Sequence, residues 1–115
     1  MIIDDGSHHM RDQQITLGQF FPILRSGGVY FLEDLHTSLA DDGHLLYGAR
    51  LDIQENRKNT TLFYLMESLS SAYCTPEQNK YLQDNIDTIE IHNQFNQHQE
   101  SWCKFRSITS AVLKR

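Results

Sequence analysis

Cysteine and basic residues are both scarce in this sequence. Only two cysteines, Cys74 and Cys103, occur in 115 residues. Two isolated cysteines exclude the disulfide framework of a small secreted domain and disfavour a structural zinc site. Lysine and arginine number 10 against 15 acidic residues, which gives a formal net charge of -5. Binding to nucleic acid backbones needs a dense basic surface. We therefore expect a reducing, cytoplasmic setting and no nucleic acid partner.

Long apolar runs are also missing. None approaches the ~20 residues that span a bilayer, and the first residues lack the basic flank and apolar stretch of a secretory signal. We expect no membrane partner. Hydrophobic residues make up 39% and charged residues 22% of the chain, which is typical of a folded globular protein. A chain of this length buries roughly two thirds of its unfolded surface, so one domain or part of one is expected.

The first 34 residues predict a strand, a helix and a second strand. Residues 1–3 are a continuous apolar run, typical of the end of a fully buried parallel strand. Residues 9–24 place apolar side chains at helical spacing after a polar opening turn at residues 11–14. Residues 29–32 form a second apolar run. Strands joined through a helix are parallel neighbours, so this segment predicts an α/β fold. The apolar helix positions are Met10, Leu17, Phe20, Phe21 and Leu24.

Punctuating residues mark the ends of the predicted helix. Ser7 is a candidate N-cap. Pro22 should tighten or end the helix, because proline disrupts a helix interior. Gly27 and Gly28 suit a break in the left-handed region before the second strand.

The rest of the sequence predicts a long loop, helices and a hairpin. Residues 35–59 are polar and irregular, and residues 60–73 have helical spacing. Thr75 is a candidate cap of a short helix that ends near residue 82. Two β-rich stretches at residues 86–91 and 102–113 predict a terminal antiparallel hairpin. We expect residues 1–115 to form a single partial domain with parallel strands plus that hairpin.

Acidic residues directly follow both predicted parallel strands. Asp4 and Asp5 follow the first, and Glu33 and Asp34 follow the second. Adjacent strands lie about 4.8 Å apart, and ligands of open α/β sheets bind beyond the carboxyl ends of the strands. Three or four carboxylates should therefore converge, with His8 one turn away. Such charges repel unless compensated, and Mg²⁺ or Mn²⁺ accepts oxygen ligands. Acidic residues that cap a helix or lie in solvent are the simpler alternative.

These residues resemble the metal-dependent class I S-adenosylmethionine methyltransferases, most closely the macrolide-sugar O-methyltransferases and their cephalosporin-hydroxylase-like relatives. The resemblance is dense over residues 2–38. In the family pattern, Asp-Gly-Ser-His is followed by Gly-Gly, an aromatic strand and Glu-Asp; here Glu33 and Asp34 follow Asp5 by 28 and 29 residues. The matching segments are Ile2-Ile3-Asp4-Asp5-Gly6-Ser7-His8, Phe21-Pro22, Gly27-Gly28-Val29-Tyr30 and Glu33-Asp34.

The resemblance implies a Rossmann-like methyltransferase sheet and a role for each matching residue. Asp5, Glu33 and Asp34 would hold Mg²⁺, and His8 would be the general base, although the adjacent His9 leaves open which histidine faces the site. The substrate would be a hydroxyl of a sugar or natural-product group, and S-adenosylmethionine would donate the methyl group. A histidine with a pKa near 6.5 suits proton removal from a metal-activated hydroxyl.

The sequence departs from the family in one respect. It has neither the Gly-rich loop after the first strand nor the acidic residue after the second that hold the donor in such folds. We therefore assign no donor-binding residue and expect the chain to represent the C-terminal half of the fold, inactive by itself. The strand at residues 2–4 should then have an exposed apolar edge, which predicts a homo-oligomer or pairing with another chain.

Two other functions remain open. In one, the half-fold is kept as a non-catalytic scaffold or oligomerisation module, with acidic residues that bind nothing. A metal-assisted hydrolase is the third reading, although Ser7 beside His8 lacks the Gly-x-Ser-x-Gly turn of a nucleophile elbow.

Overall fold

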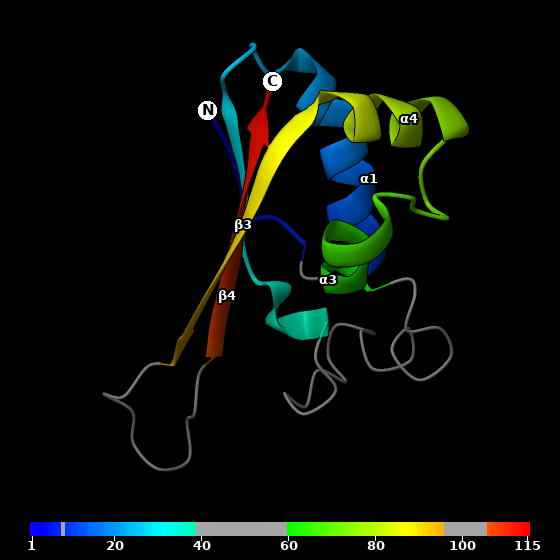
Figure 1. The fold of residues 1–115 in the computed structure, drawn as a ribbon. Coiled ribbons are helices and arrows are strands. Elements are labelled where there is room, and N and C mark those ends of the chain that lie inside the picture. The colour runs from blue at the N-terminus through cyan, green and yellow to red at the C-terminus, as the bar shows by residue number, and fades with distance from the viewer. Residues whose placement is uncertain (8, 39–59, 96–105) are drawn as a thin grey trace.

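The computed structural model describes residues 1–7, 9–38, 60–95 and 106–115. The helices α1, α3 and α4 lie on one side of the sheet (Figure 1). Residues 39–59, which include most of the predicted loop, and residues 96–105, which include most of the predicted hairpin tip and the start of its second strand, lie outside the described residues. The elements in chain order are β1 (Ile2–Asp4), α1 (Met10–Phe20), the 3₁₀ turn η1 (Phe21–Ile23), β2 (Val29–Leu32), the 3₁₀ turn η2 (Leu35–Ser38), α3 (Thr61–Phe63), the π-helical turn η6 (Tyr64–Ser68), α4 (Pro76–Asn85), β3 (Ile86–Phe95) and β4 (Arg106–Lys114).

The four strands form one sheet in the order β1-β2-β4-β3. Strands β1 and β2 are parallel, with Ile3 opposite Phe31. Strand β4 is antiparallel to both β2 and β3. The predicted strand–helix–strand unit and terminal hairpin are therefore confirmed, and this mixed α/β sheet is compatible with part of a Rossmann-like fold.

Helix α1 packs a partly polar face into the molecule. Its buried residues recur at the helical spacing of i, i+3, i+4 and i+7, and two of them are glutamines, Gln13 and Gln14, at 2% and 1% exposure. The sequence pattern assigns both to a polar opening turn, whereas the structure places them inside. Phe20, predicted on the apolar face, is 46% exposed instead. The buried positions are Met10, Gln13, Gln14, Leu17 and Gly18.

The N-terminus of α1 also differs from the prediction. The helix begins at Met10, with His9 in the N-cap position and no side-chain cap. Ser7 instead accepts a hydrogen bond from the His9 N–H at 3.1 Å and donates one to the Asp12 carboxylate at 2.8 Å. Ser7 therefore stabilises the turn between β1 and α1 rather than capping the helix.

The C-terminus of α1 agrees with the prediction. Pro22 lies in the 3₁₀ turn η1, where the helix tightens and stops. Gly27 has a φ of 79°, in the region that favours glycine. A Cβ on Gly28 would lie 2.7 Å from Leu24 Cγ, so this glycine permits close packing of the turn. Both glycines thus serve the chain reversal into β2.

The predicted helix over residues 60–73 is shorter in the structure. Thr60 caps α3 by accepting a hydrogen bond from the Phe63 N–H. The π-helical turn η6 then ends at Ser68, and its C-cap Leu69 has a φ of 48° and donates its N–H to the Tyr64 carbonyl. Helix α4 begins at a capping box formed by Thr75 and Gln78, which confirms the predicted cap.

The core lies between the sheet and the helices. It is built from large apolar side chains of both the strands and the helices, and Tyr30, Leu32 and Leu82 are fully buried. No helix in the described ranges is long and apolar enough to cross a membrane. The remaining buried members of this cluster are Leu17, Phe21, Leu24, Leu35, Tyr64, Leu65, Ile86, Ile108 and Val112.

Strand β1 is at the edge of the described sheet. Met1 is 81% and Ile3 57% exposed, so the expectation of a fully buried strand is wrong. Two features explain it: β1 has a described neighbour on one side only, and the described helices cover one face of the sheet (Figure 1). Among the described strands, β1 thus forms an edge with exposed apolar side chains, as the sequence predicted.

Candidate metal centre

The ends of β1 and β2 lie side by side. Asp4 is opposite Leu32 in the parallel register, and the Glu33 N–H continues the ladder with a 3.1 Å hydrogen bond to the Asp4 carbonyl. Asp5 and Glu33 therefore lie side by side, just beyond the carboxyl ends of two adjacent strands. Open α/β folds bind ligands beyond these ends of their strands.

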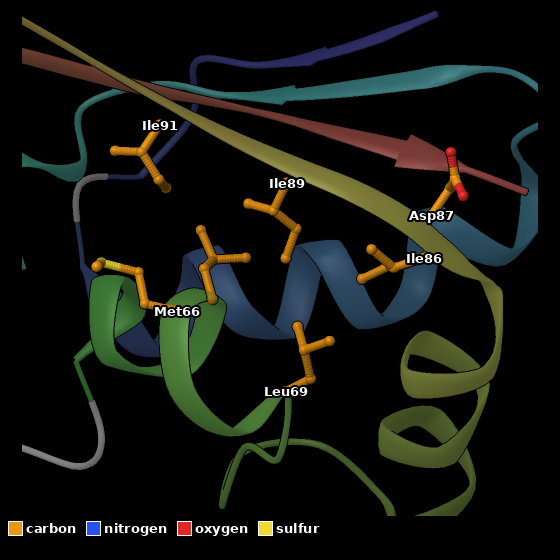
Figure 2. Close-up of a pocket in the computed structure, with 7 residues that line it drawn as sticks. Met66, Leu69, Ile86, Asp87, Ile89 and Ile91 are labelled. Carbon is orange, nitrogen blue, oxygen red and sulfur yellow. The ribbon is translucent and has the colours of Figure 1, made fainter.

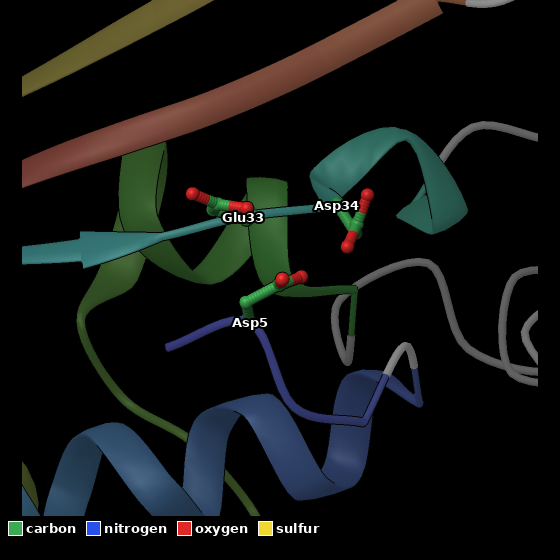
Figure 3. A group of neighbouring side chains, drawn as sticks. All are labelled: Asp5, Glu33 and Asp34. Carbon is green, nitrogen blue, oxygen red and sulfur yellow. The ribbon is translucent and has the colours of Figure 1, made fainter. Parts of the chain in front are cut away.

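Three carboxylates meet beyond the carboxyl ends of β1 and β2. One carboxylate oxygen from each of Asp5, Glu33 and Asp34 lies within 4.8 Å of the other two. Figure 3 shows Asp5 reaching from the segment after β1 toward the two acidic residues that follow β2. Asp5 is exposed, while Glu33 and Asp34 are half-buried. The structure thus brings together the three residues that the sequence singled out as metal ligands.

Asp34 has an unusual backbone conformation. Its φ is 58°, a left-handed value that is uncommon outside glycine but better tolerated by aspartate than by most residues. The Asp34 carbonyl accepts from the N–H and the hydroxyl of Thr37, at 3.5 and 3.3 Å. The left-handed residue turns the chain from β2 into η2 and sets the direction of the Asp34 side chain.

The three charges perturb one another. Partial removal from water raises the pKa of the Glu33 carboxyl, and the charges of Asp5 and Asp34 and a hydrogen bond with Asp5 raise it further. A raised pKa means that the fold favours a proton on Glu33. A cation would replace that proton and relieve the repulsion.

Asp4, the fourth acidic residue at these strand ends, is engaged elsewhere. Its Oδ2 accepts a 2.7 Å hydrogen bond from the Tyr30 hydroxyl, and its Oδ1 accepts the Gly6 N–H at 3.2 Å. Burial raises the pKa of Tyr30, and the bond to Asp4 and the charge of Asp4 raise it further, so Tyr30 remains a neutral donor. Asp4 therefore stabilises the turn, and the other three carboxylates form the cluster.

Three histidines are close to the cluster in sequence. His8, the predicted general base, lies outside the described residues. His9 is exposed at the start of α1. His36 has a side chain only 17% exposed, and its Nδ1 lies 3.8 Å from Asp34 Oδ1, because η2 turns His36 back toward the cluster.

Gln13 is a residue near the site that the sequence interpretation missed. Its side-chain amide donates to the carbonyl oxygens of Glu33 and Asp34, at 3.4 and 3.3 Å. The available signal was its spacing: Gln13 is three residues after Met10 and four before Leu17, on the buried face of α1.

Among the described residues, an apolar groove of about 490 Å³ lies between η6 and β3. Figure 2 shows isoleucines of β3 facing Met66 and Leu69, with Asp87 at one end. Met66 is 66% exposed, so the groove is open to solvent. It is formed by other elements than those that carry the carboxylate cluster. The groove is lined by Leu65, Met66, Leu69, Ile86, Asp87, Ile89 and Ile91.

The donor set of the cluster fits a hard divalent cation. All three ligands are carboxylate oxygens, which Mg²⁺ and Mn²⁺ accept. In an octahedral Mg²⁺ site, ligands about 2.1 Å from the ion are about 3.0 Å apart when adjacent and about 4.2 Å apart when opposite. The three oxygens lie within 4.8 Å of one another, so small side-chain movements would bring them to such separations, and the exposure of Asp5 leaves one side open to water or a substrate oxygen.

Comparisons with known proteins give a short match. No family model matches the chain, and no solved structure matches it. Over 38 residues the chain is 47% identical to the 8-demethyl-8-(2-methoxy-alpha-L-rhamnosyl)-tetracenomycin-C 3'-O-methyltransferase of Streptomyces olivaceus. The match covers 33% of this chain and 10% of the relative. The chain thus spans about a tenth of that relative's length, and the match supports a methyltransferase-like relationship over that segment.

Proposed function

We propose that this chain carries the metal and substrate side of a Mg²⁺-dependent O-methyltransferase that acts on a sugar-type hydroxyl. The observation that carries the proposal is the convergence of Asp5, Glu33 and Asp34 at the carboxyl ends of two parallel strands. The match to a sugar O-methyltransferase supports the reaction class and the kind of substrate.

The proposed roles follow from the side chains. Asp5, Glu33 and Asp34 would hold the ion and orient the substrate hydroxyl. Bound Mg²⁺ would supply Lewis acidity, which lowers the pKa of a hydroxyl. His8 would take the hydroxyl proton, because an imidazole with an ordinary pKa near 6.5 is a suitable base at neutral pH. The methyl donor would supply the methyl group to the substrate oxygen.

S-adenosylmethionine is the methyl donor in this proposal, but we assign no residue of this chain to it. The Gly27 and Gly28 pair precedes a strand, whereas phosphate- and nucleoside-binding glycines follow one. The described residues contain no Gly-rich loop between a strand and a helix, so we expect the chain by itself not to turn over.

Two further proposals concern the surroundings of the chain. The exposed edge of β1, with Ile3 at 57% exposure, supports self-association through that strand. The scarcity of cysteine and the free thiol of Cys74 support a reducing, cytoplasmic location.

The proposal is tested by cation-dependent unfolding. A ligand that binds only the folded state stabilises it by RT ln(1 + [L]/Kd), about 2.7 kcal/mol at a hundredfold excess over Kd. We expect MgCl₂ to raise the unfolding temperature of the chain, and Asp5→Asn or Glu33→Gln to remove that response.

The matched control is Asp84→Asn. It removes one negative charge from α4, where Asp84 pairs with Lys80 at 2.9 Å, and it should keep the full Mg²⁺ response. An equal response in Asp5→Asn and Asp84→Asn would mean that the ion acts by general screening. The cation site would then be wrong, and a scaffold function would be favoured.

A further inference from the structure

Gln13 joins the inside of α1 to the backbone of the cluster. Its side chain is 2% exposed, and its Nε2 lies 3.4 Å from the Glu33 carbonyl oxygen and 3.3 Å from the Asp34 carbonyl oxygen. A side-chain amide has two N–H donors, one for each carbonyl. A single buried group therefore contacts the backbone of two of the three acidic residues.

The orientation of this amide follows from its partners. Gln13 Oε1 accepts a 2.8 Å hydrogen bond from the Thr61 hydroxyl. A reversed amide would place its oxygen against two carbonyl oxygens and lose both bonds. Thr61 is fully buried, so Gln13 is held at both ends of its amide. The amide therefore connects α3 to the residues that follow β2 through hydrogen bonds at both of its ends.

The backbone that Gln13 contacts needs support. Asp34 has a left-handed φ of 58°, and such conformations persist where neighbouring groups stabilise them. Thr37 supplies donors from within η2. Gln13 supplies a further hydrogen-bond donor to the Asp34 carbonyl from helix α1, and the same amide also donates to the carbonyl of the preceding residue, Glu33. The peptide between the two acidic residues is thereby fixed relative to α1.

We propose that Gln13 is a positioning residue for the cation site, whose buried amide fixes the backbone of Glu33 and Asp34 so that their carboxylates converge with that of Asp5. This inference rests on the proposed function, because it assumes that the cluster binds a cation. Gln13 does not itself touch the ion. Groups that orient metal ligands in this way change metal affinity by roughly 10- to 100-fold when removed.

The chain offers a matched control in the adjacent residue. Gln14 is equally buried, at 1% exposure, and its amide bonds to the hydroxyls of Thr61 and Ser71, at 3.5 and 2.6 Å. Methionine is unbranched, has a similar length and lacks the amide N–H donors. Gln13→Met and Gln14→Met thus each remove a buried amide from the same helix, and only the first removes the donor to Glu33 and Asp34.

The experiment titrates MgCl₂ into the 115-residue chain and both variants, by calorimetry and by thermal unfolding. We expect both variants to unfold at a lower temperature without the ion. Gln13→Met should weaken Mg²⁺ binding by roughly tenfold, and Gln14→Met should bind it as the wild type does. Equal affinities in Gln13→Met and wild type, or equal weakening in the two variants, would overturn the positioning role.

A second variant applies if Gln13→Met does not fold. Thr61→Val removes the hydroxyl that orients the Gln13 amide and keeps the branched shape. We expect it to weaken Mg²⁺ binding; unchanged binding in a folded Thr61→Val chain would count against the proposal.

Asp5→Asn separates this inference from the proposed function. If Asp5→Asn loses Mg²⁺ binding while Gln13→Met keeps it, the cation site stands and the positioning role is wrong. If the wild type shows no saturable Mg²⁺ binding, or Asp5→Asn binds as tightly as the wild type, the cation site fails and the positioning role fails with it.

Discussion

The hydroxyl of Tyr30 donates a 2.7 Å hydrogen bond to the carboxylate of Asp4. Tyr30 belongs to β2 and is fully buried, whereas Asp4 is the last residue of β1. The bond ties the end of the edge strand to the core and gives two consecutive aspartates different tasks. Asp4 is committed to Tyr30 and Gly6, and Asp5 remains for the cluster.

Removal of that hydroxyl should destabilise the fold. Tyr30→Phe keeps the buried ring and the bond from the Gly6 N–H to Asp4, and it removes the phenolic donor. Hydrogen bonds to charged groups contribute about 1.5 to 3 kcal/mol, and partial solvation of Asp4 reduces this, so we expect a loss of about 1 to 2 kcal/mol. Urea unfolding at pH 7 measures it. An unchanged midpoint would show that the bond contributes nothing.

The pH dependence of stability should report on Glu33. Its pKa is raised in the fold, by partial burial first and then by Asp5 and Asp34. A raised folded pKa gives stability that is present below the unfolded pKa and lost as pH rises through the folded pKa. Without divalent ions, we therefore expect wild type to lose stability relative to Glu33→Gln as the pH rises from 4 to 7.

Mg²⁺ should reverse this trend, because a cation binds the ionised carboxylates and competes with protons. We expect its affinity for wild type to fall as the pH is lowered from 7 to 5. Thermal unfolding across this range, with and without MgCl₂, measures both effects. Parallel pH profiles for wild type and Glu33→Gln in the absence of ions would contradict the coupling among the carboxylates.

The left-handed conformation of Asp34 should be separable from its charge. Asp34→Gly and Asp34→Ala both remove the carboxylate, but only glycine adopts a φ of 58° without steric cost. We expect Asp34→Ala to be less stable than Asp34→Gly by about 1 kcal/mol. Both should lose Mg²⁺ binding. Asp34→Asn tolerates the same backbone and serves as the uncharged reference. Equal stabilities for the alanine and glycine variants would indicate that the segment relaxes to another conformation.

Self-association through β1 should depend on Ile3. Ile3 is 57% exposed on β1, which pairs on one side only with a strand of the described ranges, and a lysine there disfavours edge-to-edge pairing. We expect Ile3→Lys to shift the chain toward monomer in size-exclusion chromatography with light scattering. Ile23→Lys is the control, since Ile23 is 72% exposed but lies in η1. A wild-type chain that is monomeric at high concentration would exclude this interface.

Local patterns predicted the parts of the fold that they encode directly. The apolar runs at β1 and β2 and the helix between them predicted a parallel pair, and the parallel pair predicted that three or four of the carboxylates of Asp4, Asp5, Glu33 and Asp34 would converge; three of them do. This inference needed only the rule that parallel strands end at the same edge. The capping box at Thr75 and the turn at Pro22 were similarly local.

Features that depend on tertiary contacts were not predicted. Gln13 is polar and follows charged residues, so its sequence context indicates an exposed helix start. It is buried because its amide finds acceptors in the two residues that follow β2 and a donor on α3. The left-handed φ of Asp34 likewise has no signal in a sequence that lacks glycine there. The exposure of Ile3 depends on which neighbours surround β1, and an apolar run does not specify them.

The position of the cluster has a consequence for the strand–helix–strand unit as a whole. Asp5 precedes α1 and Glu33 follows β2, so an ion shared by them would cross-link the two ends of this segment of chain. Such an ion would bind only when both ends are in place, so it would stabilise the closed segment by its binding free energy, whereas a disulfide also constrains the unfolded chain. Within the same segment, the Gln13 side chain hydrogen-bonds to the backbone of Glu33 and Asp34, next to the carboxylates that would hold the ion. The ion would then act as a reversible cross-link, and the edge strand β1 would be better ordered when the metal is bound than when it is absent.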